Sequence, residues 1–247
     1  MGADLTFSLI DAGSFGDIPP PAAAGMRCHG CDYWERLEGH REVSTLTSVA
    51  DLKLSRLLSG TRLAGAYGML AWRTDQAGER VACGWAQFGP ISAYPRAQSI
   101  RERYAGLPDS PAPWVVTCLQ VPADFPDRAG IAAALLAAVC DELDRRGIIA
   151  VESYPERAAD PWVPSPGPAA VYEASGFVLA AADERYPVYR RELTATFADA
   201  GWGDLLSYTK PADEGGEWPL PLPKLPSDED LFRLPERPKR PNPFGED

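Results

Sequence analysis

Residues 126–147, PDRAGIAAALLAAVCDELDRRG, lie between the apolar runs WVVTCLQV at 114–121 and IIAVESYP at 148–155. Within this stretch apolar side chains recur at the intervals that place them on one face of a helix; they are Ile131, Leu135, Leu136, Val139 and Leu143. The spacing predicts an amphipathic helix over 129–146 that packs on a sheet. A strand, a helix and a strand in this order predict a right-handed crossover between two parallel neighbours.

The segments around this crossover extend it to a mixed sheet. A helix is predicted at 48–62, ending near Gly60, followed by an antiparallel hairpin of 63–74 and 80–90. The remaining predicted elements are short helices at 98–107 and 168–176, strands at 114–121 and 148–155, and paired strands at 177–182 and 186–193. The fold class is therefore α/β, with an antiparallel front half, one parallel strand-helix-strand crossover and helices on both faces of a mixed central sheet.

The composition divides the chain into three zones. Residues 1–26 are rich in Gly, Ala and Pro and show no period, so they are predicted to be a loose lead-in. The periodic segments fill 27–194, which is the predicted folded domain. In 195–247 prolines every few residues remove backbone donors, which predicts an extended or disordered acidic tail.

The charge and the cysteine content restrict the class of function. A formal net charge of -11 opposes binding to nucleic-acid phosphates or anionic lipid, so neither a nucleic acid nor a membrane is an expected partner. The N-terminus carries acids where a secretory signal would carry basic residues. The five cysteines are odd in number, which suits a reducing compartment. A cytoplasmic location is expected.

The motif CHGCDYWE at 28–35 places Cys28 and Cys31 at a spacing that metal and redox sites also use. Zinc needs about four ligands, and His40 and the other cysteines show no paired spacing, so no metal is expected. A redox role is not expected either, because no strand leads into the motif and no helix pattern clearly follows it. Neither His29 nor His40 lies near a nucleophile-elbow pattern, which argues against a hydrolase.

The first turn of the central helix is built from small residues around Gly130. Its backbone N–H groups are unshielded there, and with the helix dipole they could hold a phosphate; the residues concerned are Asp127, Arg128, Ala129, Gly130, Ile131, Ala132 and Ala133. The alternative is an ordinary crossover turn, which also begins with small residues.

Five segments follow the predicted hairpin in this order: VVTCLQV, DRAGIAAALL, AVESYP, AAVYEASGF and VYRREL. With this order of segments the chain resembles the GNAT superfamily of acyl-CoA-dependent N-acetyltransferases over about Leu63 to Leu193. In that family the helix turn binds the pyrophosphate of coenzyme A, and Gly130 and Ala132 match the last two positions of its motif. The resemblance implies acetyl-CoA as the acyl donor, with the backbone of Leu119, Gln120 and Val121 beside the pantetheine arm. CxGCxYWE is similar to an element at the start of a bacterial subgroup of such proteins.

One position departs from the family pattern. Asp127 stands where the family has a base or an amide, and its charge would repel a pyrophosphate by about 1 kcal/mol at a few Å in water. Arg128, the next residue, would offset this repulsion if its side chain turned toward the turn.

The resemblance also implies two catalytic side chains. Tyr172 in AVYEASGF occupies the place of a general acid that protonates the leaving thiolate of coenzyme A; the alternative is a tyrosine that closes the core. Glu152 in AVESYP is the candidate general base, because an acid among apolar strand residues has a raised pKa when buried. Its alternative is a strand-edge acid that faces water.

By resemblance to the same subgroup, the segment GWAQFGP at 84–90 would border the acceptor pocket, with Trp85, Gln87 and Phe88 as substrate-binding candidates. For Trp85 and Phe88 core packing is the alternative. The resulting hypothesis is acyl transfer to a small-molecule amine. A cationic acceptor suits the acidic protein better than an acidic one. Two alternatives stay open, a catalytically lapsed GNAT-like binding module and a GNAT-fold biosynthetic enzyme of altered chemistry, as does formation of a homodimer.

Overall fold

The computed structural model describes residues 5–21, 28–37, 48–75, 77–108, 112–155 and 166–193. The tail predicted at 195–247 lies outside the described residues. The helices are α1 (Val49–Ala64), α2 (Pro95–Arg101), α3 (Arg128–Arg145) and α4 (Ala169–Ala174). The strands are β1 (Leu5–Leu9), β2 (Gly68–Thr74), β3 (Arg80–Pro90), β4 (Trp114–Gln120), β5 (Ala150–Ser153), β6 (Val178–Ala181) and β7 (Val188–Glu192).

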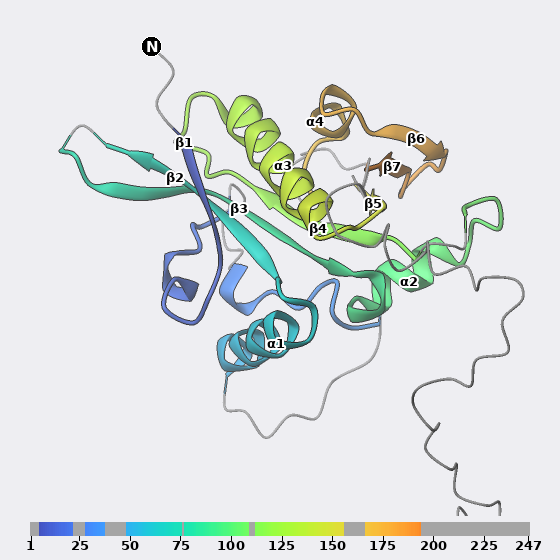
Figure 1. The fold of residues 1–247 in the computed structure, drawn as a ribbon, viewed down its shortest axis with the longest axis horizontal. Coiled ribbons are helices and arrows are strands. Elements are labelled where there is room, and N and C mark those ends of the chain that lie inside the picture. Colours follow the sequence, from blue (N-terminus) through green and yellow to red (C-terminus); the bar gives the residue numbers. More distant parts are fainter. Residues whose placement is uncertain are drawn as a thin grey trace, which may run out of the picture. The chain divides into compact units, whose positions relative to one another are not determined.

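The strands form one seven-stranded sheet in the order β1-β2-β3-β4-β5-β7-β6. Among these pairings β4 and β5 are parallel, and the others are antiparallel. Helices α3 and α4 lie on one face of the sheet and α1 lies on the other (Figure 1). The predicted α/β fold class and its single parallel crossover are confirmed.

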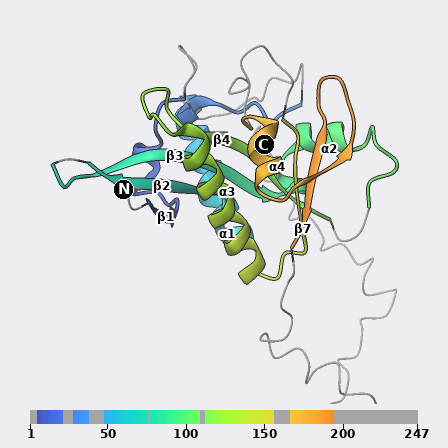
Figure 2. The same cartoon turned by 90° about the horizontal axis from the view of Figure 1, so that it is seen from above.

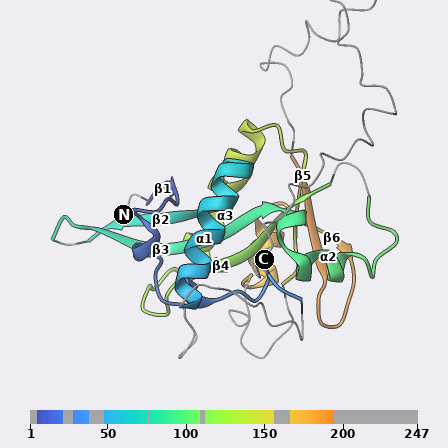
Figure 3. The ribbon, with the colours of Figure 1, turned by 90° about the horizontal axis from the view of Figure 1, so that it is seen from below.

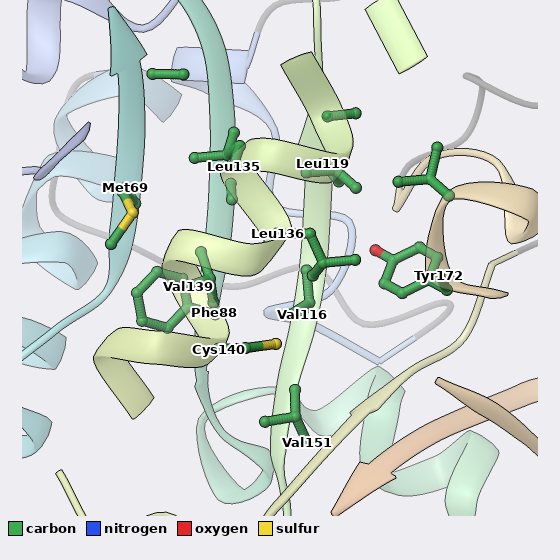
Figure 4. Packing of buried hydrophobic residues seen from close by; sticks show 14 of the residues in the cluster. Met69, Phe88, Val116, Leu119, Leu135, Leu136, Val139, Cys140, Val151 and Tyr172 are labelled. Atoms are coloured by element: carbon green, nitrogen blue, oxygen red, sulfur yellow. The ribbon is translucent and has the colours of Figure 1, made fainter. Parts of the chain in front are cut away.

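Helix α3 crosses the strands with α4 beside it (Figure 2), and its apolar face builds the main core. Leu135, Leu136 and Val139 are fully buried and project toward Phe88 and β4 (Figure 4). Burial of a side chain of this size stabilises the fold by about 1.5–3 kcal/mol. The predicted apolar stripe is therefore the contact that fixes the helix on the sheet.

Helix α1 lies across the opposite face (Figure 3). Its N-cap Ser48 accepts a hydrogen bond from the Asp51 backbone N–H at 3.1 Å. The helix was expected to end near Gly60, but it continues to Ala64 and ends at Gly65, which has φ 75°. Gly60 instead lies within the helix against the ring of Tyr67, so its small size serves packing there and the left-handed cap is Gly65.

Strand β1 falls inside the segment 1–26 that was expected to be a loose lead-in. It pairs antiparallel with β2, and Leu5, Phe7 and Leu9 pack against the main core. These three residues alternate with polar ones, which is the period of a half-buried strand. The Gly- and Pro-rich composition that follows obscured this short alternation.

The sheet opens between β4 and β5. On β3, Gln87 pairs with Cys118 and the next residue, Phe88, pairs with Val116, so Thr117 is an extra residue that bulges β4. The β4–β5 pairing ends at Val116 and Ser153. Among the described residues the parallel β4–β5 register therefore consists of three residue pairs. Pro155, two residues after the end of β5, lacks the N–H that would continue the ladder.

We expect Gly68→Ala to lower the free energy of unfolding by about 1–3 kcal/mol, because overpacking a filled site forces backbone shifts. A Cβ at Gly68 would lie 2.7 Å from the Ala86 carbonyl oxygen and would collide with the Trp85 ring. Urea denaturation measures the change. Gly16→Ala is the control, since a Cβ there meets no atom within 4 Å; equal midpoints for the two variants would contradict the prediction.

Candidate functional site

The opening beside β4 lies between the loop that leads into α4 and the residues that precede α3. Gly167, at φ 88°, approaches β4 so closely that a Cβ would lie 2.9 Å from the carbonyl oxygen of Leu119. The side chains of Leu119, Gln120 and Val121 are buried. Only their backbone groups could contact a ligand along this edge, and Gly167 already stands next to one of them.

The start of α3 is capped by the chain itself. The Asp127 carboxylate is the N-cap, and its Oδ1 accepts a hydrogen bond from the Gly130 N–H at 3.0 Å. Asp127, Ala129 and Gly130 are exposed, whereas Ile131 and Ala132 are buried. The turn predicted to hold a pyrophosphate is thus open to solvent, but one of its amide donors is bound to an anion of the protein.

Arg128 is the first residue of α3, and its side chain reaches back to the end of β4. Its Nε donates a hydrogen bond to the Val121 carbonyl oxygen at 3.2 Å. The guanidinium is therefore held at the strand end, one residue from the Asp127 carboxylate. It brings a positive charge next to the turn, and Ala133, one turn further along α3, is half-buried.

Tyr172 projects from α4 toward β4 (Figure 4). It is fully buried, and its hydroxyl donates to the Pro166 carbonyl oxygen at 2.8 Å. Burial raises the pKa of this phenol, and the side chain of Ser153 beside it lowers that pKa. Because Ser153 is the last residue of β5 that pairs with β4, the Tyr172 hydroxyl lies at the apex of the opening.

Glu152 lies in the sheet with no exposed surface. Its Oε1 accepts from Arg190 at 2.7 Å, while its Oε2 accepts from Arg101 at 3.1 Å and from the Tyr154 hydroxyl at 2.6 Å. These contacts connect β5 with β7 and α2. Burial and the adjacent Glu152 charge raise the pKa of Tyr154. Both carboxylate oxygens are engaged, so the role of Glu152 as a base stays a prediction.

Gln87 lies at the centre of a buried polar network. Its Oε1 accepts from Lys53 Nζ at 2.7 Å, and its Nε2 donates to Glu35 at 2.9 Å and to the Tyr67 hydroxyl at 2.9 Å. Glu35 is also ion-paired with Lys53 and Arg56, at 3.2 and 3.1 Å. The amide predicted to contact substrate is thus bound on both ends to protein side chains, and it joins the CHGCDYWE segment to α1 and β3.

Trp85 and Phe88, the other predicted substrate contacts, are core residues with 1% and 0% exposure. The hydrogen-bond network around Gln87 was not predicted from the sequence. Lys53 stands four residues before the fully buried Leu57 on α1, and this helical spacing places both on the inner face. That spacing was the available signal for a buried lysine, and a buried lysine requires a carboxylate partner.

Two buried donors lie beside this network. The Tyr94 hydroxyl, fully buried, is next to Gln87 and Thr117. The Trp34 indole Nε1 is in a side chain that is 4% exposed. Within the described residues the Trp34 Nε1 makes no hydrogen bond. Burial raises the pKa of the Tyr94 hydroxyl, and the side chains of Gln87 and Thr117 beside it oppose that rise. Both side chains pack in the buried cluster that α2 forms with the sheet.

Within the ranges that the structure describes, no group of His, Cys, Asp or Glu side chains is arranged to hold a metal ion. His29 contacts the Phe15 carbonyl oxygen through Nε2 at 3.0 Å and packs edge-on against the Phe15 ring. In the same described part of the chain, no helix has the length and apolar content needed to cross a membrane.

Comparisons with known proteins find similarity in solved structures. No protein family model and no curated protein sequence matches the chain. An N-acetyltransferase from Staphylococcus aureus Mu50 is similar over 77% of this chain and 99% of its own, at 11% identity and a TM-score of 0.44. YncA, a putative acetyltransferase from Salmonella typhimurium with acetyl-CoA, is similar over 76% of this chain and 94% of its own, at 13% identity and a TM-score of 0.43.

A GNAT family N-acetyltransferase, YhbS from Escherichia coli in complex with CoA, is similar over 77% of this chain and 83% of its own. Its identity is 18% and its TM-score is 0.38. Similarity at this level does not assign an activity or a substrate to the chain.

We expect Glu152→Gln to lower the free energy of unfolding by about 3 kcal/mol, because it removes the buried carboxylate that pairs with Arg101 and Arg190 and leaves Arg190 with only the exposed Glu192. Urea denaturation measures the loss. Glu184→Gln, at an exposed position, makes the same change of charge and should alter stability by less than about 0.5 kcal/mol. A small effect at Glu152 would show that its ion pairs do not hold β5, β7 and α2 together.

Proposed function

We propose that the protein is an acyl-CoA-dependent N-acyltransferase of the GNAT type, which transfers an acyl group, acetyl in the first instance, to the amine of a small molecule. The observation that carries this proposal is the opening between the parallel strands β4 and β5, produced by the bulge at Thr117. An extended ligand arm would lie along β4 beyond the last β4–β5 pair, in the direction that a further strand would take.

Coenzyme A would supply an activated thioester at this opening. Its pantetheine arm would lie along the backbone of Leu119, Gln120 and Val121, and its pyrophosphate would bind the exposed turn at 127–133. The fit is partial. The exposed Gly130 leaves the backbone accessible, whereas the Asp127 carboxylate occupies the Gly130 N–H and carries the wrong charge.

The chain's own residues would act from two faces of the sheet. Tyr172, at the apex of the opening, carries the hydroxyl that would donate a proton to the leaving thiolate, and in this structure that hydroxyl donates to the Pro166 carbonyl oxygen. The acceptor amine would approach from the opposite face, which carries the Gln87 network.

A second candidate function is a binding module that has lost acyl transfer. Two observations favour it: the N-cap role of Asp127 and the close approach of Gly167 to Leu119. Both place groups of the protein where the cofactor would lie. The two candidates differ in whether acetyl-CoA binds.

We expect acetyl-CoA to bind the full chain and Asp127→Asn to tighten binding by about 1 kcal/mol, or about fivefold, as estimated for one charge at a few Å in water. Asparagine keeps an acceptor for the Gly130 N–H, so the cap is preserved. Isothermal titration calorimetry measures both affinities.

Asp141→Asn is the matched control for this titration. It removes the same charge from an exposed position on α3 about 20 Å further along the helix axis, well beyond the screening length of about 8 Å. Its affinity should equal that of the parent protein. If neither the parent nor Asp127→Asn binds acetyl-CoA at millimolar concentration, the binding-module candidate replaces the transferase.

We expect Tyr172→Phe to reduce turnover with little change in acetyl-CoA affinity, because the lost group is a proton donor. Turnover is measured as release of the coenzyme A thiol with a panel of cationic amines, amino acids and aminoglycosides. Tyr189→Phe, which removes a hydroxyl bound to Glu173 in the same core cluster, controls for stability. Equal turnover in the two variants would remove Tyr172 from the mechanism.

A further inference from the structure

The outer side of helix α1 carries a stripe of residues that line one hollow on the protein surface. The inner side of the helix packs on the sheet through two buried residues, Lys53, which donates to Gln87, and Leu57. At the helical period the stripe falls on the side of α1 that points away from these two residues. The α1 stripe consists of Asp51, Leu54, Ser55, Leu58, Ser59 and Arg62.

Two leucines lie in the α1 stripe one helical turn apart. Leu58 is 48% exposed, and Leu54 is half-buried. A single exposed leucine is common at a protein surface, but two leucines at this spacing form one continuous apolar contact. A serine directly follows each leucine, so a small side chain lies beside each large one. Alternation of large and small side chains is the pattern that lets two helices interdigitate.

The order of residues in the α1 stripe is complementary to its own reverse. Along the helix the stripe runs Asp, Leu, Ser, Leu, Ser, Arg, and its spacing is the same in both directions. A second copy of α1 that lies antiparallel therefore meets the stripe position by position, with Leu54 facing Ser59 and Leu58 facing Ser55. A parallel copy would instead place each residue on its own counterpart. The antiparallel arrangement has the two-fold symmetry of a closed dimer, in which both copies use the same surface.

The charges at the two ends of the α1 stripe favour the same orientation. Asp51 is in the first turn of α1 and Arg62 is in the last, and both are exposed. The Asp51 Oδ2 accepts from the Ser48 hydroxyl at 2.7 Å, which holds the carboxylate at the start of the helix. In the antiparallel pair each Asp51 faces an Arg62. Exposed ion pairs contribute about 0–1 kcal/mol each, so the charges select the orientation while the leucines supply buried apolar area.

We propose that two copies of this chain associate through the α1 stripe, with the two helices antiparallel about a two-fold axis. Helix α1 has 16 residues and is about 24 Å long. One helix face of this length covers less than the roughly 800 Å² per partner of a standard interface, so the dimer is weak, with a dissociation constant of about 10–100 µM. The net charge of -11 on each copy also opposes a tight complex.

The dimer would place the inner side of α1 one helix layer away from the second copy. That inner side contributes Lys53, whose ammonium contacts both Glu35 and Gln87. Association would therefore bury the helix that holds the buried polar network on the face proposed for the acceptor. The pattern of the α1 stripe carries this inference independently of any binding of coenzyme A.

Sedimentation equilibrium of the full chain from about 5 µM to about 1 mM tests the proposal. The average mass should rise from 26.7 kDa toward twice that value. Leu58→Asp should keep the mass at that of one chain, because it places a carboxylate from each copy in the apolar contact. Ser55→Gln should do the same, because the longer side chain fills the space that Leu58 of the other copy needs. Leu63→Asp is the matched control, since Leu63 is an 81% exposed leucine of α1 outside the stripe, and this variant should associate as the parent protein does.

Exchange of the charges tests the antiparallel orientation. Asp51→Lys and Arg62→Asp, measured separately, should each associate about tenfold more weakly than the parent protein, because like charges then meet at both ends of the stripe. An equimolar mixture of the two variants should associate again, because opposite charges then meet at both ends, and a loss of structure would not be restored by mixing. Cooperative melting confirms that each variant is folded.

Four results would overturn the proposal. They are a parent protein that keeps the mass of one chain throughout the range, association that persists in Leu58→Asp, an equal loss of association in Leu58→Asp and Leu63→Asp, and a mixture of the charge variants that associates no better than its components.

Discussion

The parallel pairing between β4 and β5 ends after three residue pairs, and the rest of the molecule is arranged around that short contact. The bulge at Thr117 directly follows the last of these pairs on β4, and Pro155, two residues after the end of β5, cannot donate a ladder hydrogen bond. With only three residue pairs between β4 and β5, the two halves of the sheet are also joined by the layers that pack on its faces. Helices α3 and α4 cover one face, and α1 and α2 with the 28–35 segment cover the other.

The two faces of the sheet are stabilised by different kinds of interaction. The face beneath α3 is apolar, and its stability comes from fully buried side chains such as Leu135 and Val116. The opposite face contains two buried carboxylates, Glu35 and Glu152, each ion-paired with two cations. Desolvation makes such groups costly to leave unpaired, so each cluster fixes the relative position of the elements that contribute to it.

Local signals in the sequence predicted most of the fold. The apolar period of α3 and the alternation in the hairpin were sufficient for those elements, because each depends on residues close together in the chain. Strand β1 was not predicted within 1–26, because its three alternating apolar residues are too few to distinguish a strand from a loop. The partners of Glu152 could not be predicted, because Arg101 and Arg190 lie 51 and 38 residues away in sequence. The cap formed by Asp127 was accessible in principle, since aspartate before a helix is a preferred N-cap.

The Asp127 carboxylate has two opposing effects at the start of α3. By motif, an acid at this position opposes a pyrophosphate; by geometry, the same acid stabilises α3 by binding the Gly130 N–H. Capping by aspartate contributes about 1 kcal/mol to a helix, and its repulsion of a nearby anion is of the same order. Neither effect dominates, so a bound anion would have to compete with the cap for one amide while Arg128, held at Val121, supplies a compensating charge. At the start of α3, capping by Asp127 and its repulsion of an anion are therefore of similar size. A change that removes the Asp127 charge but keeps the cap would test the repulsion alone.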